Sequence, residues 1–382
     1  MKNPLPIPSL PPSDLAIPHS RAHGSHDSDA AEQLKSLLQA AGQYDLGGPG
    51  HESGAESGGA AAAESEVESA AKTVADPASR GWIRVTGSDR VRWLNGMVTN
   101  SMQQLQPGQG CYNFILSAQG RIQGDCYAFA QADSLLLETH REQVAPLLAL
   151  LDRFIIMDDV ELRDESAEWV GIGIAGPNAA EVLAKLSILG HASGIQLSDL
   201  QLNGFGHVRL VAAHHPGVPR FELWASPNAI QSLRNEVLGA GAALCGAEAV
   251  EWLRILEGIP LYGKDIRDKD LPQETAQAHA LHFAKGCYIG QEIVERIRSR
   301  GAVHRTFSGF RLKGDLPAVD GTALEADGQK VGELTSFARI PLDGGEATLA
   351  LGYVRREALE RNTELRYPGG VAEAVGLPLR FS

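Results

Sequence analysis

Apolar residues first recur with regular spacing near residue 81. The stretch 81–85 predicts a strand, and Ser88 or Asp89 is placed to cap the helix that follows it. Apolar and polar residues then alternate in three further predicted strands, at residues 111–116, 122–130 and 134–138. The Gly-containing turn 117–121 lies between the first two of these strands and predicts a hairpin.

The rest of the chain continues this mixture of short strands and helices. Its pattern predicts, in chain order, a helix at 144–156, a strand at 160–163, a strand–turn–helix at 169–178, a strand at 220–224 and a helix at 229–238. After residue 305, short apolar segments are separated by Gly, Pro and Asp, which is typical of a small β-barrel. Because strands and helices are mixed without regular βαβ alternation, we assign the α+β class.

The first 80 residues contain few large apolar side chains. Residues 1–30 are rich in Pro, Ser, His and Asp and predict a disordered tail. Leu34 and Leu37 lie on one face of a short amphipathic helix predicted at 31–41. Residues 48–79 consist mostly of Gly, Ala, Ser and Glu, a composition that buries too little surface to order itself.

Acidic charge is concentrated at the N-terminus. The first 78 residues carry 4 Lys+Arg against 11 Asp+Glu, and the remaining 304 carry 30 against 36. This larger part is only mildly acidic and has no basic block, which argues against nucleic-acid binding. No stretch approaches the roughly 18 apolar residues that a membrane-spanning helix needs, and the Pro-rich start has no signal-peptide pattern.

The four cysteines, Cys111, Cys126, Cys245 and Cys287, are widely spaced along the chain. Their spacing matches neither a disulfide framework nor a zinc site, so we expect a reducing, cytoplasmic setting. Gly171, Gly173 and Gly176 fit the spacing G-x-G-x-x-G, but they alternate within a predicted strand instead of following it. We therefore reject NAD binding.

The most distinctive segment is Lys-Gly-Cys-Tyr-Ile-Gly-Gln-Glu, which precedes a predicted helix. Its motif residues are Lys285, Gly286, Cys287, Tyr288, Gly290, Gln291 and Glu292. The Cys287 thiol would lie near the positive end of the helix dipole, and Lys285 would add a second positive charge; both favour the reactive thiolate. Local physics equally allows a half-buried structural cysteine in a tight turn.

This motif resembles the signature of the YgfZ family, folate-binding proteins that support iron–sulfur cluster assembly and repair. That family is similar to the aminomethyltransferase, or T-protein, of the glycine cleavage system. The resemblance runs from about residue 82 to the C-terminus and implies two ferredoxin-like modules and a C-terminal barrel, forming a three-lobed ring around folate. It places the aminomethyltransferase-like region at 31–304, with 48–79 as an insertion in a surface loop, and the barrel at 305–382.

The same resemblance implies a set of tetrahydrofolate contacts. Arg254 matches the folate-directed arginine of the pattern L-R-x-E-A-G, Glu222 matches the strand G-[YF]-E-[IL], and Tyr112 and Asn113 match the strand G-x-x-Y. Each has an ordinary alternative: a structural ion pair for Arg254, a surface carboxylate for Glu222 and a core position for Tyr112.

Two features argue against a working aminomethyltransferase. The first of the paired aspartates in the T-protein pattern is replaced by Gly124, so that only Asp125 remains, and T-proteins lack the cysteine motif. The L-R-x-E carboxylate is replaced by Leu256, with Glu257 shifted by one position, which leaves open a scaffold that has lost folate binding. We also consider a metal site at His279, His282 and Cys287, but histidines near an Ala-rich segment are more often packing residues, so we expect no resident metal.

These observations favour a tetrahydrofolate-binding protein that assists iron–sulfur cluster assembly or repair through Cys287. Its expected partners are iron–sulfur client enzymes and an A-type cluster carrier. The thiol would act as a nucleophile or redox group with folate, or as a transient cluster ligand. The alternatives are a folate-dependent aminomethyl or one-carbon transferase and a non-catalytic scaffold that has lost folate binding.

Overall fold

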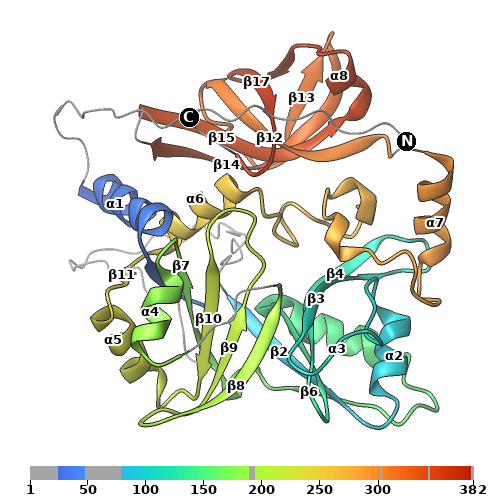
Figure 1. The fold of residues 1–382 in the computed structure, drawn as a ribbon. Helices are drawn as coiled ribbons and strands as arrows, with labels where there is room; N and C mark the ends of the chain where they lie inside the picture. The colour runs from blue at the N-terminus through green and yellow to red at the C-terminus, as the bar shows by residue number, and fades with distance from the viewer. Residues whose placement is uncertain (1–24, 48–78, 189–193, 302, 343–344, 380–382) are drawn as a thin grey trace, which may run out of the picture.

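The computed structural model describes residues 25–47, 79–188, 194–301, 303–342 and 345–379, whose strands form three sheets (Figure 1). The first sheet has the order β11-β1-β7-β10-β9-β8. Its strands are β1 (Gly42–Asp45), β7 (Val170–Ala175), β8 (Gln196–Leu202), β9 (Gly206–Ala212), β10 (Arg220–Ala225) and β11 (Ala243–Leu244). The helices from the same stretches of chain are α1 (Ser25–Gln39), α4 (Ala179–Lys185), α5 (Ile230–Gly239) and α6 (Ala247–Glu257).

The second sheet has the order β3-β4-β5-β2-β6. Its strands are β2 (Arg80–Thr86), β3 (Gly110–Leu116), β4 (Ile122–Ala130), β5 (Leu135–His140) and β6 (Glu161–Asp164). Helices α2 (Arg90–Met97) and α3 (Val144–Asp152) supply apolar side chains to the core of this module. Strands β3 and β4 pair as the predicted hairpin.

The third sheet is a closed barrel of six strands in the order β12-β15-β14-β13-β16-β17. Its strands are β12 (Arg305–Gly314), β13 (Thr322–Ala326), β14 (Gln329–Leu342), β15 (Gly345–Arg355), β16 (Leu365–Tyr367) and β17 (Gly370–Val375). Helix α7 (Gln291–Arg300) precedes the barrel, and α8 (Arg356–Glu360) follows β15. The predicted α+β class with a C-terminal barrel is therefore confirmed.

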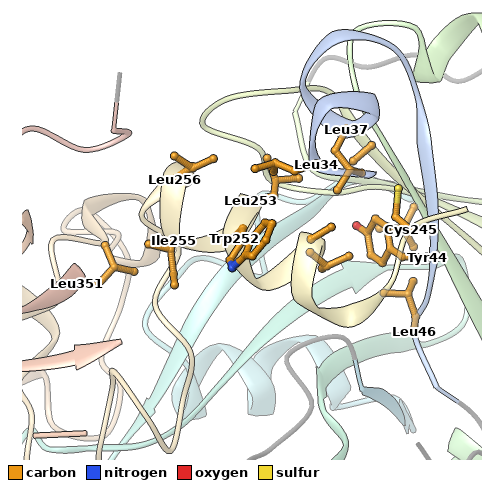
Figure 2. Packing of buried hydrophobic residues seen from close by; sticks show 14 of the residues in the cluster. Leu34, Leu37, Tyr44, Leu46, Cys245, Trp252, Leu253, Ile255, Leu256 and Leu351 are labelled. Atoms are coloured by element: carbon orange, nitrogen blue, oxygen red, sulfur yellow. The ribbon is translucent and has the colours of Figure 1, made fainter. Parts of the chain in front are cut away.

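Helix α6 lies between the barrel and the first sheet, and its apolar side chains join the two (Figure 1). Figure 2 shows Trp252, Leu253 and Ile255 of α6 within a cluster that also includes Leu37 of α1 and Leu351 of β15. All of these side chains are buried, and burying apolar surface of this kind contributes roughly 25 cal/mol per Å². The position of α6 is therefore fixed by packing on both sides.

Gly171 and Gly173 lie within strand β7, as the sequence predicts. A side chain at Gly173 would collide with the ring of Tyr44 on β1, and one at Gly171 would meet the ring of Trp224 on β10. These glycines thus admit large aromatic rings from the neighbouring strands. These glycines lie inside the strand, whereas the glycines of a dinucleotide-binding loop come after the strand.

The N-terminal prediction needs correction. Helix α1 begins at Ser25, within the predicted tail, and residues 1–24 and 48–78 lie outside the described residues. After the helix, Gly42 begins strand β1. The sequence did not predict this strand, because its four residues show no clear alternation of apolar and polar side chains. The predicted insertion starts and ends at one place, because the backbone N–H of Arg80 donates to Leu46 O at 3.0 Å.

Two further predictions are wrong in detail. Asp89 is the N-cap residue of α2, yet its carboxylate accepts from the backbone N–H of Asp159 at 2.9 Å and makes no cap hydrogen bond. Helix α3 ends at Asp152, and the apolar residues Ile156 and Met157, expected at or near its end, are exposed. Among the described residues, no helix is long and apolar enough to span a membrane.

Candidate functional site

A pocket opens where the first sheet, the second sheet and α6 meet. Its aromatic and polar lining residues are Tyr44, Arg80, Tyr112, Asp125, Tyr127, His140, Gln143, His214, Arg220, Arg254, Glu257, Tyr262 and Gln277. A second cavity shares His214, Glu257 and Gln277 with it and reaches Phe307 and Ser308 of the barrel. We call the two together the central pocket. All three lobes therefore contribute to it.

Tyr112 lines the pocket, as the resemblance implies. Its hydroxyl donates to Asp125 Oδ2 at 2.5 Å, and Gln143 Nε2 donates to Asp125 Oδ1 at 2.7 Å. Asn113, the next residue of β3, is fully buried and does not line the pocket. Its side chain accepts from the backbone N–H of Asn100 and donates to Cys111 O, so its placement is that of a structural residue.

Neighbouring residues of β4 face opposite sides of the sheet, so positions 124 and 125 have different surroundings. Asp125 lines the pocket, whereas a side chain at Gly124 would meet Leu147 of α3 at 2.6 Å, in the core of the second module. The carboxylate that faces the pocket is therefore present. The replacement at Gly124 therefore alters a position that faces the core of the second module and leaves the carboxylate of Asp125 at the pocket.

Three rings from different segments stack along one side of the pocket. The rings of Tyr112 and His279 lie 5.3 Å apart at 29°, and those of His279 and His214 lie 4.3 Å apart at 25°. Burial lowers the pKa of His279 to about 4, helped by His214. No group of three potential metal ligands converges anywhere in the described part of the chain, and His279 belongs to this stack.

Arg254 lines the pocket, but its hydrogen-bonding capacity is taken up by the protein. Nε and Nη2 form a bidentate pair with Glu251 at 2.6 and 2.7 Å. Nη1 donates to Asp265 Oδ2 and Ile259 O, and Nη2 also donates to Ser336 Oγ of the barrel. All five donors of the guanidinium are thus engaged. This geometry is that of the structural ion pair, the alternative that the sequence left open.

Glu222 lies beneath the pocket wall and not on it. It is buried, accepts from Trp224 Nε1 at 3.1 Å and lies 3.7 Å from a guanidinium nitrogen of Arg220. Its other neighbour is Glu138 of β5. Burial raises the pKa of Glu138 to about 8, and the hydrogen bond and charge of Glu222 add to the effect. Glu138 therefore retains a proton near neutral pH.

Glu257 supplies a carboxylate to the pocket, although the glutamate position of the L-R-x-E pattern is occupied by Leu256. It lines both parts of the central pocket, and its Oε1 accepts from the backbone N–H of Val218 at 2.8 Å. Burial raises its pKa. Leu256, at the position that the pattern gives to glutamate, is buried in the apolar cluster around α6. A shift of one position along the helix end thus exchanges a core residue for a pocket residue.

Cys287 lies outside the central pocket, on an exposed turn before α7. Lys285 does not serve this thiol as the sequence suggested. Its ammonium donates to the backbone oxygens of Asn95, Val98 and Asn100 at 2.7, 2.6 and 2.6 Å, at the C-terminal end of α2. The lysine charge therefore satisfies carbonyl oxygens that the end of a helix leaves unpaired.

Burial lowers the pKa of Lys285 to about 8, and the thiol that interacts with it electrostatically is Cys111. The cap of α7 is Gly290, three residues beyond Cys287, whereas the dipole effect fades within the first turn. Neither source of positive charge predicted for Cys287 therefore lies at its thiol.

The other motif residues dock the turn onto the second module. Tyr288 is buried with Lys285 Nζ 4.9 Å from its ring centroid, and Gln291 Oε1 accepts from the Tyr288 backbone N–H at 3.3 Å. Gly290 has φ +81°, and a side chain there would meet Ser117 O at 2.6 Å. Glu292 forms an i,i+4 ion pair with Arg296 at 2.8 Å. The motif thus holds the exposed Cys287 in one place.

The sequence also matches the family described as the GCVT N-terminal domain over residues 34–285, which is more than half of the chain. The chain belongs to this family. The GCVT family assignment agrees with the sequence resemblance to the aminomethyltransferase and with the three-lobed arrangement.

Two curated relatives and one solved structure are similar to the chain. A chloroplastic protein of Arabidopsis thaliana, provisionally named a transferase, is 27% identical over 288 residues, which cover 75% of this chain and 66% of that protein, just under two thirds. An aminomethyltransferase of Rubrobacter xylanophilus is 28% identical, with 74% of this chain and 76% of that protein covered. The crystal structure of the glycine cleavage system aminomethyltransferase T from Bartonella henselae has a TM-score of 0.73 at 19% identity, covers 91% of this chain and 88% of its own, and shares the GCVT-like fold.

Proposed function

We propose that the protein is a YgfZ-like member of the GCVT family, which binds tetrahydrofolate in the central pocket and assists assembly or repair of iron–sulfur clusters through Cys287. The observation that carries this proposal is the placement of Cys287. It is the exposed cysteine among the four, on a turn that the rest of its motif fixes to α2 and to the β3–β4 hairpin. A motif of this kind serves to present one thiol to a partner molecule.

The residues of the central pocket fit tetrahydrofolate. Four tyrosine rings line it, and a flat heteroaromatic ligand packs well against such rings. Asp125 and Glu257 offer carboxylate oxygens to the amino-pyrimidine edge of a pterin. When bound, tetrahydrofolate would supply a carrier for one-carbon units or a reductant.

A single thiolate is not enough to hold a cluster, because iron–sulfur clusters take about four protein ligands. Cys287 would therefore bind a cluster only together with ligands of a client enzyme or of an A-type carrier. The remaining cysteines are poorly suited to the task. Burial raises the pKa of Cys111 to about 11 and of Cys245 to about 12, and Cys126 is buried with a raised pKa.

A second function, one-carbon transfer to tetrahydrofolate, is favoured by Asp125. This carboxylate lines the pocket and is oriented by Tyr112 and Gln143, as a group that steers a reacting nitrogen would need to be. The aminomethyltransferase name of the Rubrobacter relative agrees with this alternative. Cys287, outside the pocket, would have no part in it.

Two measurements separate these functions. Calorimetric titration with tetrahydrofolate tests the pocket, and absence of binding would leave only a folate-independent scaffold. Activity of iron–sulfur enzymes in cells that lack the protein, complemented with wild type, Cys287→Ser or Asp125→Asn, then tests the role. We expect Cys287→Ser to fail while binding tetrahydrofolate normally. Rescue by Cys287→Ser combined with failure of Asp125→Asn would favour the transferase.

A further inference from the structure

The side chains of two arginines in the wall of the central pocket make no hydrogen bond within the described residues. Arg80 is the first residue of β2 and Arg220 the first residue of β10, so they come from different sheets. Their side chains are only 18% and 15% exposed, and each Nε is buried without a partner. Buried guanidinium groups are normally hydrogen-bonded, because a buried donor without an acceptor has lost its water and gained no partner in return.

The carboxylates below them do not use these donors. Arg80 lies 3.7 Å from Glu138, and Arg220 lies 3.7 Å from Glu222, which is an ion-pair distance but too long for a hydrogen bond. Arg254 differs in this respect, since all its donors are engaged. The cationic hydrogen-bonding capacity that the pocket leaves for a ligand therefore belongs to Arg80 and Arg220.

We propose that Arg80 and Arg220 form a carboxylate-binding subsite in the wall of the central pocket. A guanidinium presents planar, paired N–H donors that match the two oxygens of a carboxylate. Glu138, Glu222 and Glu257 lie close to these arginines, so a group with a single negative charge is repelled less than a dianionic phosphate. Tyr44, with the Arg220 guanidinium 5.5 Å from its ring centroid, keeps that side chain in place.

The subsite rests on the proposed folate binding only for the identity of its ligand. One source of the carboxylate is the glutamyl tail of tetrahydrofolate, and the other is a separate small carboxylate bound beside the pterin. Three probes distinguish them by calorimetry: tetrahydrofolate, 6-methyltetrahydropterin, which lacks the tail, and glutarate. Displacement of glutarate by tetrahydrofolate identifies the tail, and simultaneous binding identifies a separate carboxylate.

The test compares Arg80→Lys and Arg220→Lys with wild type. Lysine keeps a positive charge beside Glu138 and Glu222, which protects folding, but it loses the paired donors of arginine. Arg153→Lys, on the exposed loop after α3, is the matched control, and melting temperatures verify that all variants are folded. We expect each pocket variant to weaken the carboxylate-bearing ligand about 10- to 100-fold, with a change of less than about 2-fold for 6-methyltetrahydropterin.

Two outcomes overturn the subsite: unchanged affinity for both carboxylate-bearing probes, or an equal loss for 6-methyltetrahydropterin, which would assign the arginines to the ring. The proposed function fails separately. If tetrahydrofolate does not bind but glutarate binds in a manner that depends on Arg80 and Arg220, the carboxylate subsite is supported and the proposed folate binding is rejected. If tetrahydrofolate binds wild type and both lysine variants equally, the proposed folate binding is supported and the subsite is rejected.

Discussion

Arg254 Nη1 donates to Asp265 Oδ2 at 2.7 Å, and Asp265 is completely buried. The other oxygen of Asp265 accepts from the hydroxyls of Thr335 and Ser336 on β14. This ion pair thus joins the end of α6 to the barrel. An arginine that the resemblance assigns to the ligand is bound on every side by the protein itself.

Replacing Arg254 should therefore impair folding more than binding. We expect Arg254→Ala to lower the free energy of unfolding by about 3–5 kcal/mol, because it leaves the Asp265 carboxylate buried without its cation. Urea denaturation measures this change. Arg141→Ala, at a half-exposed arginine 3.7 Å from Asp164, should change it by less than about 1 kcal/mol. An Arg254→Ala protein of normal stability that no longer binds tetrahydrofolate would restore the ligand role.

Exposure should set the order in which the cysteines react. We expect iodoacetamide to alkylate Cys287 before Cys111, Cys126 and Cys245, because Cys287 is exposed while burial raises the pKa of the other three. Mass spectrometry after brief treatment at pH 7.5 measures the order. Cys111→Ser should support iron–sulfur enzymes as wild type does, which makes it the control for Cys287→Ser. If Cys287 reacts last, its turn is not presented to partners.

The raised pKa of Glu138 should make stability depend on pH. With the pKa of Glu138 raised to about 8, the native chain keeps a proton that the unfolded chain loses near pH 4.5. Stability should therefore fall as pH rises from about 4.5 to 8, by up to about 1.4 kcal/mol per pH unit. Glu138→Gln should flatten this dependence and stabilise the protein at pH 8.

Denaturation at several pH values tests the effect of Glu138→Gln against Glu142→Gln, at an exposed position next to β5. His279, whose pKa is lowered to about 4, acts in the opposite direction between pH 4 and 6.5, so each variant must be compared with wild type at the same pH. Parallel curves for Glu138→Gln and wild type would show that the pKa of Glu138 is not raised in the folded protein.

Removing residues 48–78 should leave the fold intact. The two ends of this segment are adjacent. The backbone N–H of Arg80 donates a hydrogen bond to Leu46 O, and a Cβ atom at Gly47 would lie 3.6 Å from Ser79 Cα. A short Gly-Ser link is therefore enough to span the gap, and added loop length costs little in chain entropy. We expect a melting temperature within a few degrees of wild type. A large drop would mean that the segment packs on the protein.

The sequence predicted the elements with strong periodicity and missed those without it. The β3–β4 hairpin and α7 have clear patterns and a Gly-containing turn or cap, and both form as predicted. Strand β1 was missed because its four residues owe their conformation to pairing with β7 and β11, which lie far away in the sequence. Long-range pairing of this kind outweighs local propensity.

The site was predicted less completely than the fold. Tyr112 lines the pocket as expected, but Arg80 and Arg220 gave no signal, since an arginine at the start of a strand is usually exposed. Their role depends on two sheets facing each other across the pocket. The placement of Glu257 was likewise decided by where α6 ends, a detail that pattern matching at Leu256 does not capture.

The docking of Lys285 bears on protein engineering. Its ammonium needs three carbonyl oxygens that converge only where α2 ends, and Gly290 needs the close approach of Ser117. Copying the eight residues 285–292 into an aminomethyltransferase that lacks them would therefore leave a buried ammonium without acceptors. A transplant of the thiol would have to carry the end of α2 and the β3–β4 turn along with it.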